Sequence, residues 1–179
     1  MDFTDVVLTK VGNIAVIKLN RPKAFNSLGF LEEIIESLEI CSDDKEVRAI
    51  ILTGEGKAFC SGGDLTVAKQ YHSESVTLFR QLTKPLNRVI KELRTIPKPI
   101  VAAINGATGG AGLSLAAACD LRIAAASSKF RQSYTTVGLV SDGGWSLTIP
   151  MLVGFAKAAE MVFLDPSSGE GNRINSQDC

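Results

Sequence analysis

The sequence predicts a single α/β domain in which parallel strands alternate with helices. One observation is the pattern: short β-rich runs, such as Ile14–Leu19 and Val47–Thr53, alternate with longer stretches whose apolar residues recur at helical spacing. The other is length, because 179 residues that are 45% hydrophobic can build one substantial core but are too few for two. Parallel strands need a crossover, so helices are expected to cover the sheet.

The first part of the chain predicts a β-α-β unit. Ile14–Leu19 is one strand, and Val47–Thr53 is a nearly continuous apolar run, as in a strand buried on both faces. Between them, leucines and isoleucines from Leu28 to Leu38 recur at helical spacing. Ser27 is available as the N-cap of this helix, and acidic residues follow early in it.

The second part repeats the alternation and ends in a polar segment. Residues 76–93 predict a long helix that stops before two prolines, and residues 100–105, 112–119 and 121–126 predict a strand, an Ala/Leu-rich helix and a strand. The stretch 167–179 carries one apolar side chain apart from the terminal cysteine, too little for a core. We therefore expect a core of residues 1–165 and a disordered polar tail of residues 166–179.

Charge and cysteine content restrict the partners and the compartment. The 19 basic and 19 acidic side chains balance, unlike those of a nucleic-acid binder, and no apolar run is long enough to cross a bilayer. The four cysteines form no C-x-x-C pair, so we expect neither a metal site nor a redox dithiol. With no secretory signal visible, reduced thiols in a cytoplasmic protein are expected, although the organelle stays open. The partner is then a small molecule or another subunit.

Two glycine-rich turns that follow predicted strands are the first candidates for a site. They are GKAFCSGGDL (residues 56–65) and NGATGGAG (residues 105–112), and the second opens a helix. Small residues let a ligand reach backbone N–H groups, and a helix start adds partial positive charge. Together the turns can form an oxyanion hole with two donors, or each is a tight turn without a ligand. Neither contains the phosphate-binding pattern G-x-x-x-x-G-K-[ST].

Four blocks, in order along the chain, resemble the enoyl-CoA hydratase/isomerase (crotonase) superfamily. They are NRPKAFN (20–26), KAFCSGGDL (57–65), NGATGGAG with SLAAACDLRIA (105–112 and 114–124), and VGLVSDGG with IPMLVG (137–144 and 149–154). Four ordered blocks are far more specific than one motif. The resemblance implies a β-β-α spiral of the ClpP/crotonase type and a homotrimer or hexamer. It also implies an acyl-CoA thioester as substrate, with no cofactor beyond the coenzyme A that the substrate carries.

Carried over by position, the resemblance also assigns site residues. The two oxyanion amides fall on the main-chain N–H groups of Gly63 and Ala111. Lys23 either meets a CoA phosphate or is a solvated lysine beside a turn, and Tyr134 and Trp145 either line the acyl pocket or fill the core. The implied substrate-binding residues are Lys23, Ala24, Phe25, Ser61, Asp64, Leu65, Gly110 and Tyr134.

The residues at the family's acid and base positions favour a double-bond shift over hydration. Hydratases of the family use two glutamates, but the matching positions here are Ser114 and Tyr134, which activate water poorly. Asp142 aligns with the single acidic base of the members that shift double bonds; otherwise it is a turn residue before Gly-Gly. A hydratase or other lyase of the same fold, and a catalytically silent acyl-CoA-binding subunit, stay open as alternatives.

His72, Asp120 and the end of the chain are not expected to contribute catalytic residues. His72, the sole histidine, is expected on an exposed helix rather than as a base, and Asp120 is expected to form structural hydrogen bonds at a helix end. Family members continue well beyond the position of Leu164, with helices that close the acyl pocket. The resemblance therefore implies that the usual C-terminal helices are missing here and that apolar surface is exposed in their place.

Overall fold

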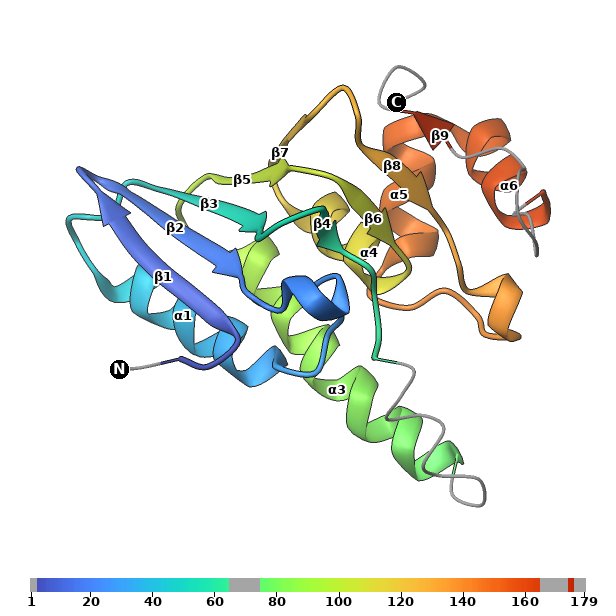
Figure 1. The fold of residues 1–179 in the computed structure, drawn as a ribbon, viewed down its shortest axis with the longest axis horizontal. Helices are drawn as coiled ribbons and strands as arrows, with labels where there is room; N and C mark the ends of the chain where they lie inside the picture. Colours follow the sequence, from blue (N-terminus) through green and yellow to red (C-terminus); the bar gives the residue numbers. More distant parts are fainter. Residues whose placement is uncertain (1–2, 65–74, 165–173, 176–179) are drawn as a thin grey trace.

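The computed structural model describes residues 3–64, 75–164 and 174–175, without the side chains of 75–79 and 174–175, and its strands form two sheets (Figure 1). The first sheet contains, in hydrogen-bonded order, β1 (Val6–Val11), β2 (Ile14–Leu19), β3 (Ala49–Gly54), β5 (Ile100–Ile104) and β7 (Leu121–Ala124). The second contains, in order, β4 (Ala58–Cys60), β6 (Ala107–Gly109), β8 (Lys129–Arg131) and β9 (Ile174–Asn175).

The chain repeats one path through these sheets. Each of β3, β5 and β7 is followed by a short strand of the second sheet and then by a helix. β2, β3, β5 and β7 pair in parallel, whereas β1 and β2 form an antiparallel hairpin. This repeated β-β-α path confirms the predicted α/β class and the spiral. The helices are α1 (Leu31–Asp43), α3 (Ser75–Thr95), α4 (Ala111–Ala118), α5 (Trp145–Val153) and α6 (Phe155–Phe163), and 3-10 turns span Pro22–Ala24 and Thr135–Val137.

The core lies between the five-stranded sheet and the helices. α1 and α3 pack against each other below this sheet in Figure 1, and α4 packs against α3 and α5. β3 alternates half-buried and buried residues, so neither of its faces is fully exposed, as its apolar run predicted. Asp120 accepts a hydrogen bond from the Ile100 N–H at 2.8 Å, which confirms its structural role at the end of α4. Within the described part of the chain, no helix is both long and apolar enough to span a bilayer.

The predicted start of the first helix is wrong. α1 begins at Leu31 rather than after Ser27. Ser27 is buried, and its hydroxyl donates to the Asp64 carboxylate at 3.4 Å instead of capping the helix. Leu28, which the helical spacing included, forms a parallel bridge with Gly63. Tertiary pairing with the glycine-rich turn thus overrides the local capping signal.

Of the predicted polar tail, residues 166–179, the structure describes two residues. Ile174 and Asn175 form β9, whose backbone pairs antiparallel with β8 opposite Phe130 and Lys129. The other residues from 166 onward lie outside the described residues, so the disorder of this segment stays a prediction.

Candidate active site

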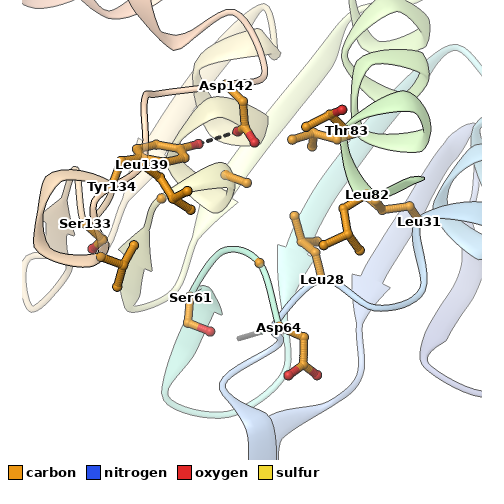
Figure 2. Close-up of a pocket in the computed structure, with 15 residues that line it drawn as sticks. Leu28, Leu31, Ser61, Asp64, Leu82, Thr83, Ser133, Tyr134, Leu139 and Asp142 are labelled. Carbon is orange, nitrogen blue, oxygen red and sulfur yellow. Dashed lines mark hydrogen bonds between the residues drawn. The ribbon is translucent and has the colours of Figure 1, made fainter. Parts of the chain in front are cut away.

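A cavity of about 120 Å³ lies where the two glycine-rich turns meet α3, α4 and the loop before α5 (Figure 2). Leucines 28 and 82, with Thr83, face Tyr134 and Leu139 across it. Most of the exposed lining is apolar. The leucine and valine side chains of this lining are Leu28, Leu31, Leu82, Leu86, Val137 and Leu139.

The two turns touch through backbone atoms. Gly62 has a φ of +101°, and a Cβ atom on it would stand 2.8 Å from the Gly109 carbonyl oxygen and 3.2 Å from the Ala111 nitrogen. Only glycine tolerates both this φ and this proximity. Gly63 follows Gly62 in the first turn, and Ala111 lies at the end of the second turn. Because the two turns are in contact, both residues lie on the wall of one cavity.

The direction of the Gly63 N–H follows from the bridge to Leu28. The Leu28 N–H donates to the Gly62 carbonyl oxygen at 2.7 Å, and the Asp64 N–H donates back to the Leu28 carbonyl oxygen at 3.4 Å. The Gly62 carbonyl and the Gly63 N–H belong to one planar trans peptide, so they point in opposite directions. The Gly63 N–H therefore points away from Leu28, and Gly63 itself lines the cavity.

Ala111 places a second main-chain N–H group at the cavity wall. It is the first residue of α4, and the N–H groups of a first helical turn have no partner within their own helix. The first bonds of this helix run from the Leu113 and Ser114 N–H groups to the Gly110 carbonyl oxygen, at 3.0 and 3.3 Å. Gly110 and Ala111 both line the cavity, so the positive end of α4 faces it.

Asp142 is held at the cavity by two hydroxyl groups. The Tyr134 hydroxyl donates to Asp142 Oδ1 at 2.6 Å, drawn as the dashed line in Figure 2, and the Ser114 hydroxyl donates to the Asp142 main-chain oxygen at 3.0 Å. Burial raises the pKa of Asp142, and the bond from Tyr134 opposes that rise. Burial and the neighbouring Asp142 charge raise the pKa of Tyr134, so the phenol keeps its proton at neutral pH.

The other implied substrate-binding residues divide into two groups. Ser61 and Asp64 line the cavity, but the Asp64 carboxylate accepts a bond from Arg21 Nη1 at 3.2 Å and turns away from the other side chains in Figure 2. Residues 23–25 do not line this cavity; they lie beside it, where the Ser61 N–H donates to the Phe25 carbonyl oxygen at 3.0 Å. Leu65 lies outside the described residues, as does His72.

Two asparagines to which the sequence motifs assign no role fix the turn between β3 and β4. Asn26 is fully buried, and its amide nitrogen donates to the Glu55 and Ala58 carbonyl oxygens at 3.0 and 2.8 Å. Asn105 donates to the Gly56 and Ala58 carbonyl oxygens at 2.9 and 3.2 Å. Asn26 ends one sequence block and Asn105 begins another, but an asparagine beside a turn does not reveal which distant carbonyl groups it binds.

The described cysteines do not supply a nucleophile. Burial raises the pKa of Cys60 and of Cys119 to about 12, and that of Cys41 to about 11. These thiols stay protonated at neutral pH, and the thiolate is the reactive form. No group of three or more His, Cys, Asp or Glu residues with metal-binding geometry occurs in the parts of the chain that the structure describes.

Trp145 belongs to the core rather than to the cavity lining. It is buried in the hydrophobic core at the start of α5. Its indole nitrogen has no hydrogen-bond partner among the described residues. Of the two aromatic residues expected either to line an acyl pocket or to fill the core, Tyr134 lines the cavity and Trp145 does not.

Comparison with known proteins finds similarity along most of this chain. The family model of enoyl-CoA hydratase/isomerase matches residues 9–178. The short-chain-enoyl-CoA hydratase of Clostridium acetobutylicum is 35% identical over 166 residues, which are 91% of this chain and 62% of that protein. The trans-2-decenoyl-[acyl-carrier-protein] isomerase of Streptococcus mutans is 29% identical over 164 residues, which are 90% of this chain and 62% of that protein.

A solved structure shares the fold. The crystal structure of an enoyl-CoA hydratase from Polaromonas sp. JS666 matches with a TM-score of 0.88 and 36% identity, over 96% of this chain and 65% of that one. The chain therefore spans less than two thirds of the length of these three proteins.

Proposed function

The chain belongs to the enoyl-CoA hydratase/isomerase family, and we propose that its protein shifts a double bond in an enoyl-CoA thioester. One observation carries this proposal: Asp142 reaches the cavity that Gly63 and Ala111 line, and the residues at the family's two glutamate positions, Ser114 and Tyr134, bind Asp142. Of the two carboxylates among the described lining residues, Asp64 is bound by Arg21, so Asp142 is the one that we propose for proton transfer. One carboxylate suffices for a double-bond shift.

In the proposed reaction the thioester carbonyl oxygen accepts hydrogen bonds from the Gly63 and Ala111 N–H groups. Asp142 removes a proton from the α-carbon of a 3-enoyl thioester, and the electron pair of that bond enters a dienolate whose negative charge rests on the carbonyl oxygen. The same proton then returns to the γ-carbon, which leaves a 2-enoyl thioester and an ionised Asp142. Losing one preorganised donor of this kind costs about 2.7–4 kcal/mol of activation free energy.

The environment of Asp142 supports its role as the base. A general base works best when its pKa lies near the working pH, and burial moves the pKa of this carboxyl upward. Asp142 acts as a base only when ionised, so the rate of the proposed reaction falls as the pH drops through its raised pKa. This predicts an acid limb that lies above the usual pKa of an aspartate.

The shape of the site supports an acyl-CoA substrate. The leucine and valine side chains of the cavity suit the acyl chain, and the exposed residues Lys23 and Phe25, beside the first glycine-rich turn, suit the coenzyme A portion. We propose that the reaction needs no cofactor other than the coenzyme A of the substrate. We also propose a homo-oligomer, supported by the apolar side chains exposed on α5 and α6.

Hydration of a 2-enoyl thioester is the second candidate reaction. The hydratase names of the Clostridium and Polaromonas proteins favour it. It requires activation of a water molecule and protonation of carbon, for which Asp142 is the available carboxylate next to Ser114 and Tyr134.

A parallel assay of 3-enoyl and 2-enoyl thioesters separates the two reactions. We expect conversion of the 3-enoyl thioester, its loss in Asp142→Asn, and retained thioester binding in that variant by calorimetry. Asp43→Asn, at an exposed carboxylate that ends α1 away from the cavity, is the matched control and is expected to stay active. Hydration without isomerisation would reject the proposed reaction, and binding without turnover would identify a silent acyl-CoA-binding protein.

A further inference from the structure

The hydroxyl protons around Asp142 can be assigned one by one. An ionised carboxylate only accepts hydrogen bonds, so the single hydroxyl proton of Tyr134 lies in its 2.6 Å bond to Asp142 Oδ1. The single hydroxyl proton of Ser114 lies in its 3.0 Å bond to the Asp142 main-chain oxygen. The 3.4 Å approach of the two hydroxyl oxygens therefore needs no shared proton. Because Asp142 Oδ1 accepts the hydrogen bond from Tyr134, Oδ2 is the carboxylate oxygen available for proton transfer.

From this geometry we propose that Tyr134 is a positioning residue: by holding Oδ1, it makes Oδ2 alone take and return the substrate proton. The inference rests on the proposed double-bond shift. A carboxylate free to rotate would offer either oxygen and would lose alignment between the α- and γ-carbons. A carboxylate held at one oxygen keeps the other in place through both steps.

Tyr134 is itself fixed by its surroundings. Its side chain is buried, and its main-chain N–H donates to the buried Gln132 side-chain oxygen at 2.8 Å. On the other side, a Cβ atom on Gly143 would stand 2.8 Å from Ser114 Cβ, so α4 packs directly against the loop that carries Asp142. The phenol and the carboxylate therefore meet on two anchored segments, as an arrangement that controls orientation requires.

After burial, the Tyr134 bond has the largest effect on the pKa of Asp142, followed by a bond from the main-chain N–H of Asp142 itself. The lining residues from α3 are uncharged, namely Leu82, Thr83 and Leu86. The other titratable side chain among the described lining residues is Asp64, whose carboxylate Arg21 binds. Burial raises the pKa of Asp142 and the phenol bond lowers it, so removal of the phenol raises this pKa further.

The path of the transferred proton can be followed with a deuterium label. The proton moves from the α-carbon to Oδ2 and from Oδ2 to the γ-carbon, while Tyr134 keeps its own proton throughout. A deuterium placed at the α-carbon is thus expected to appear at the γ-carbon of the product. When Oδ1 is released, rotation of the carboxyl group opens exchange with solvent, and less label is retained.

The first test titrates Asp142 directly by carbon-13 NMR of labelled aspartate side chains, with Asp142→Asn to assign the signal. Tyr134→Phe keeps the ring and removes the hydroxyl, and we expect the Asp142 signal to titrate at higher pH than in the parent protein. A second variant strengthens the hydrogen bond from residue 134 to Asp142 instead of removing it. Tyr71→Phe leaves Tyr134 as the sole tyrosine, so incorporated 3-fluorotyrosine, a stronger donor, is expected to lower the titration midpoint. Midpoints that do not move in these directions overturn the inference, and the fluorinated protein decides it if Tyr134→Phe does not fold.

The second test uses an α-deuterated 3-enoyl thioester. Tyr134→Phe is expected to lower kcat by about tenfold to a hundredfold with a smaller change in KM, to shift the acid limb to higher pH and to retain less label. Ser114→Ala, which leaves the phenol bond in place, is expected to keep the acid limb where it is. If the parent protein does not isomerise the thioester, the proposed reaction fails and the positioning role fails with it, while the NMR titration still decides whether the Tyr134 bond lowers the pKa of Asp142. Unchanged label retention and an unshifted acid limb in Tyr134→Phe would contradict the inference.

Discussion

At the residue scale, the adjacent glycines 62 and 63 have opposite steric surroundings. A Cβ atom on Gly62 would collide with Gly109 of the other turn, whereas one on Gly63 would meet nothing within 4 Å. Gly62→Ala is therefore expected to destabilise the protein by about 1–3 kcal/mol, because alanine at this positive φ is strained and pushes the turns apart. Gly63→Ala is expected to fold with nearly unchanged stability. Urea unfolding of the pair checks this, and equal stabilities would show that the two turns do not meet as described.

The ionised side chain of Asp142 is expected to lower the free energy of unfolding. Because burial raises its pKa in the folded protein, the ionised form is less favourable there than in the unfolded chain. Asp142→Asn is thus expected to be more stable than the parent protein above the folded-state pKa, and this gain should vanish as the pH falls to the usual aspartate pKa. Thermal unfolding of both proteins across this pH range measures the difference. If the stability advantage of Asp142→Asn instead grew as the pH fell, the pKa of Asp142 would not be raised in the folded protein.

Site residues were predictable where a motif names a position, and not where a contact depends on the fold. Gly63, Ala111 and Asp142, assigned from blocks far apart in the sequence, do line one cavity. Their chemical roles stay predictions. Asn26 was missed because its partners lie on another turn, and Ser27 was misread as a helix cap because its real partner is Asp64, 37 positions away.

At the scale of elements, the parallel strands of the first sheet were predictable, whereas β1 and the three-residue strands of the second sheet were not. β2 coincides with the predicted run, whereas β4, β6 and β8 have three residues each, too few for a period to be recognised. Glycine-rich turns adjoin β4 and β6, so composition there indicates a loop. β1 was missed too, because its last residues are exposed and mostly polar.

The turn between β3 and β4 depends on Asn26. Asn26→Ala leaves the Glu55 carbonyl oxygen and the Arg21 N–H without this partner, so we expect a loss of about 2 kcal/mol of stability. Asn13→Ala is the matched control, because Asn13 donates one exposed hydrogen bond to the Glu46 carbonyl oxygen and should cost much less. Chemical denaturation compares the two variants. Similar losses would mean that Asn26 does not anchor the turn.

At the scale of the whole molecule, large apolar side chains are exposed on the last two described helices. Met151 is 78% exposed, and Phe155 and Phe163 are both 81% exposed. Exposed apolar surface of this kind marks an interaction site or a tendency to aggregate. We expect the chain to self-associate with rising concentration, and Phe155→Lys with Phe163→Lys to reduce that association in sedimentation velocity.

Val11→Lys is the control, because Val11 is an exposed apolar residue of β1. It is expected to leave the self-association unchanged. A parent chain that stays monomeric at all concentrations would contradict both this prediction and the proposed homo-oligomer. The trimeric or hexameric state and the cytoplasmic location stay predictions from the sequence.

Alternation of strand and helix patterns predicted the α/β class, but the spiral came from the four motif blocks. Periodicity describes one element at a time, whereas the spiral depends on which short strand joins the second sheet. That pairing places the ends of β4 and β6 together and so brings the two glycine-rich turns into contact.

The crystal structure of the protein with a bound acyl-CoA thioester tests the central claim most directly. We expect the thioester carbonyl oxygen to lie within hydrogen-bond distance of both the Gly63 and the Ala111 nitrogen atoms, with Asp142 Oδ2 beside the α-carbon. A carbonyl oxygen that contacts neither nitrogen, or only one of them, would contradict the account.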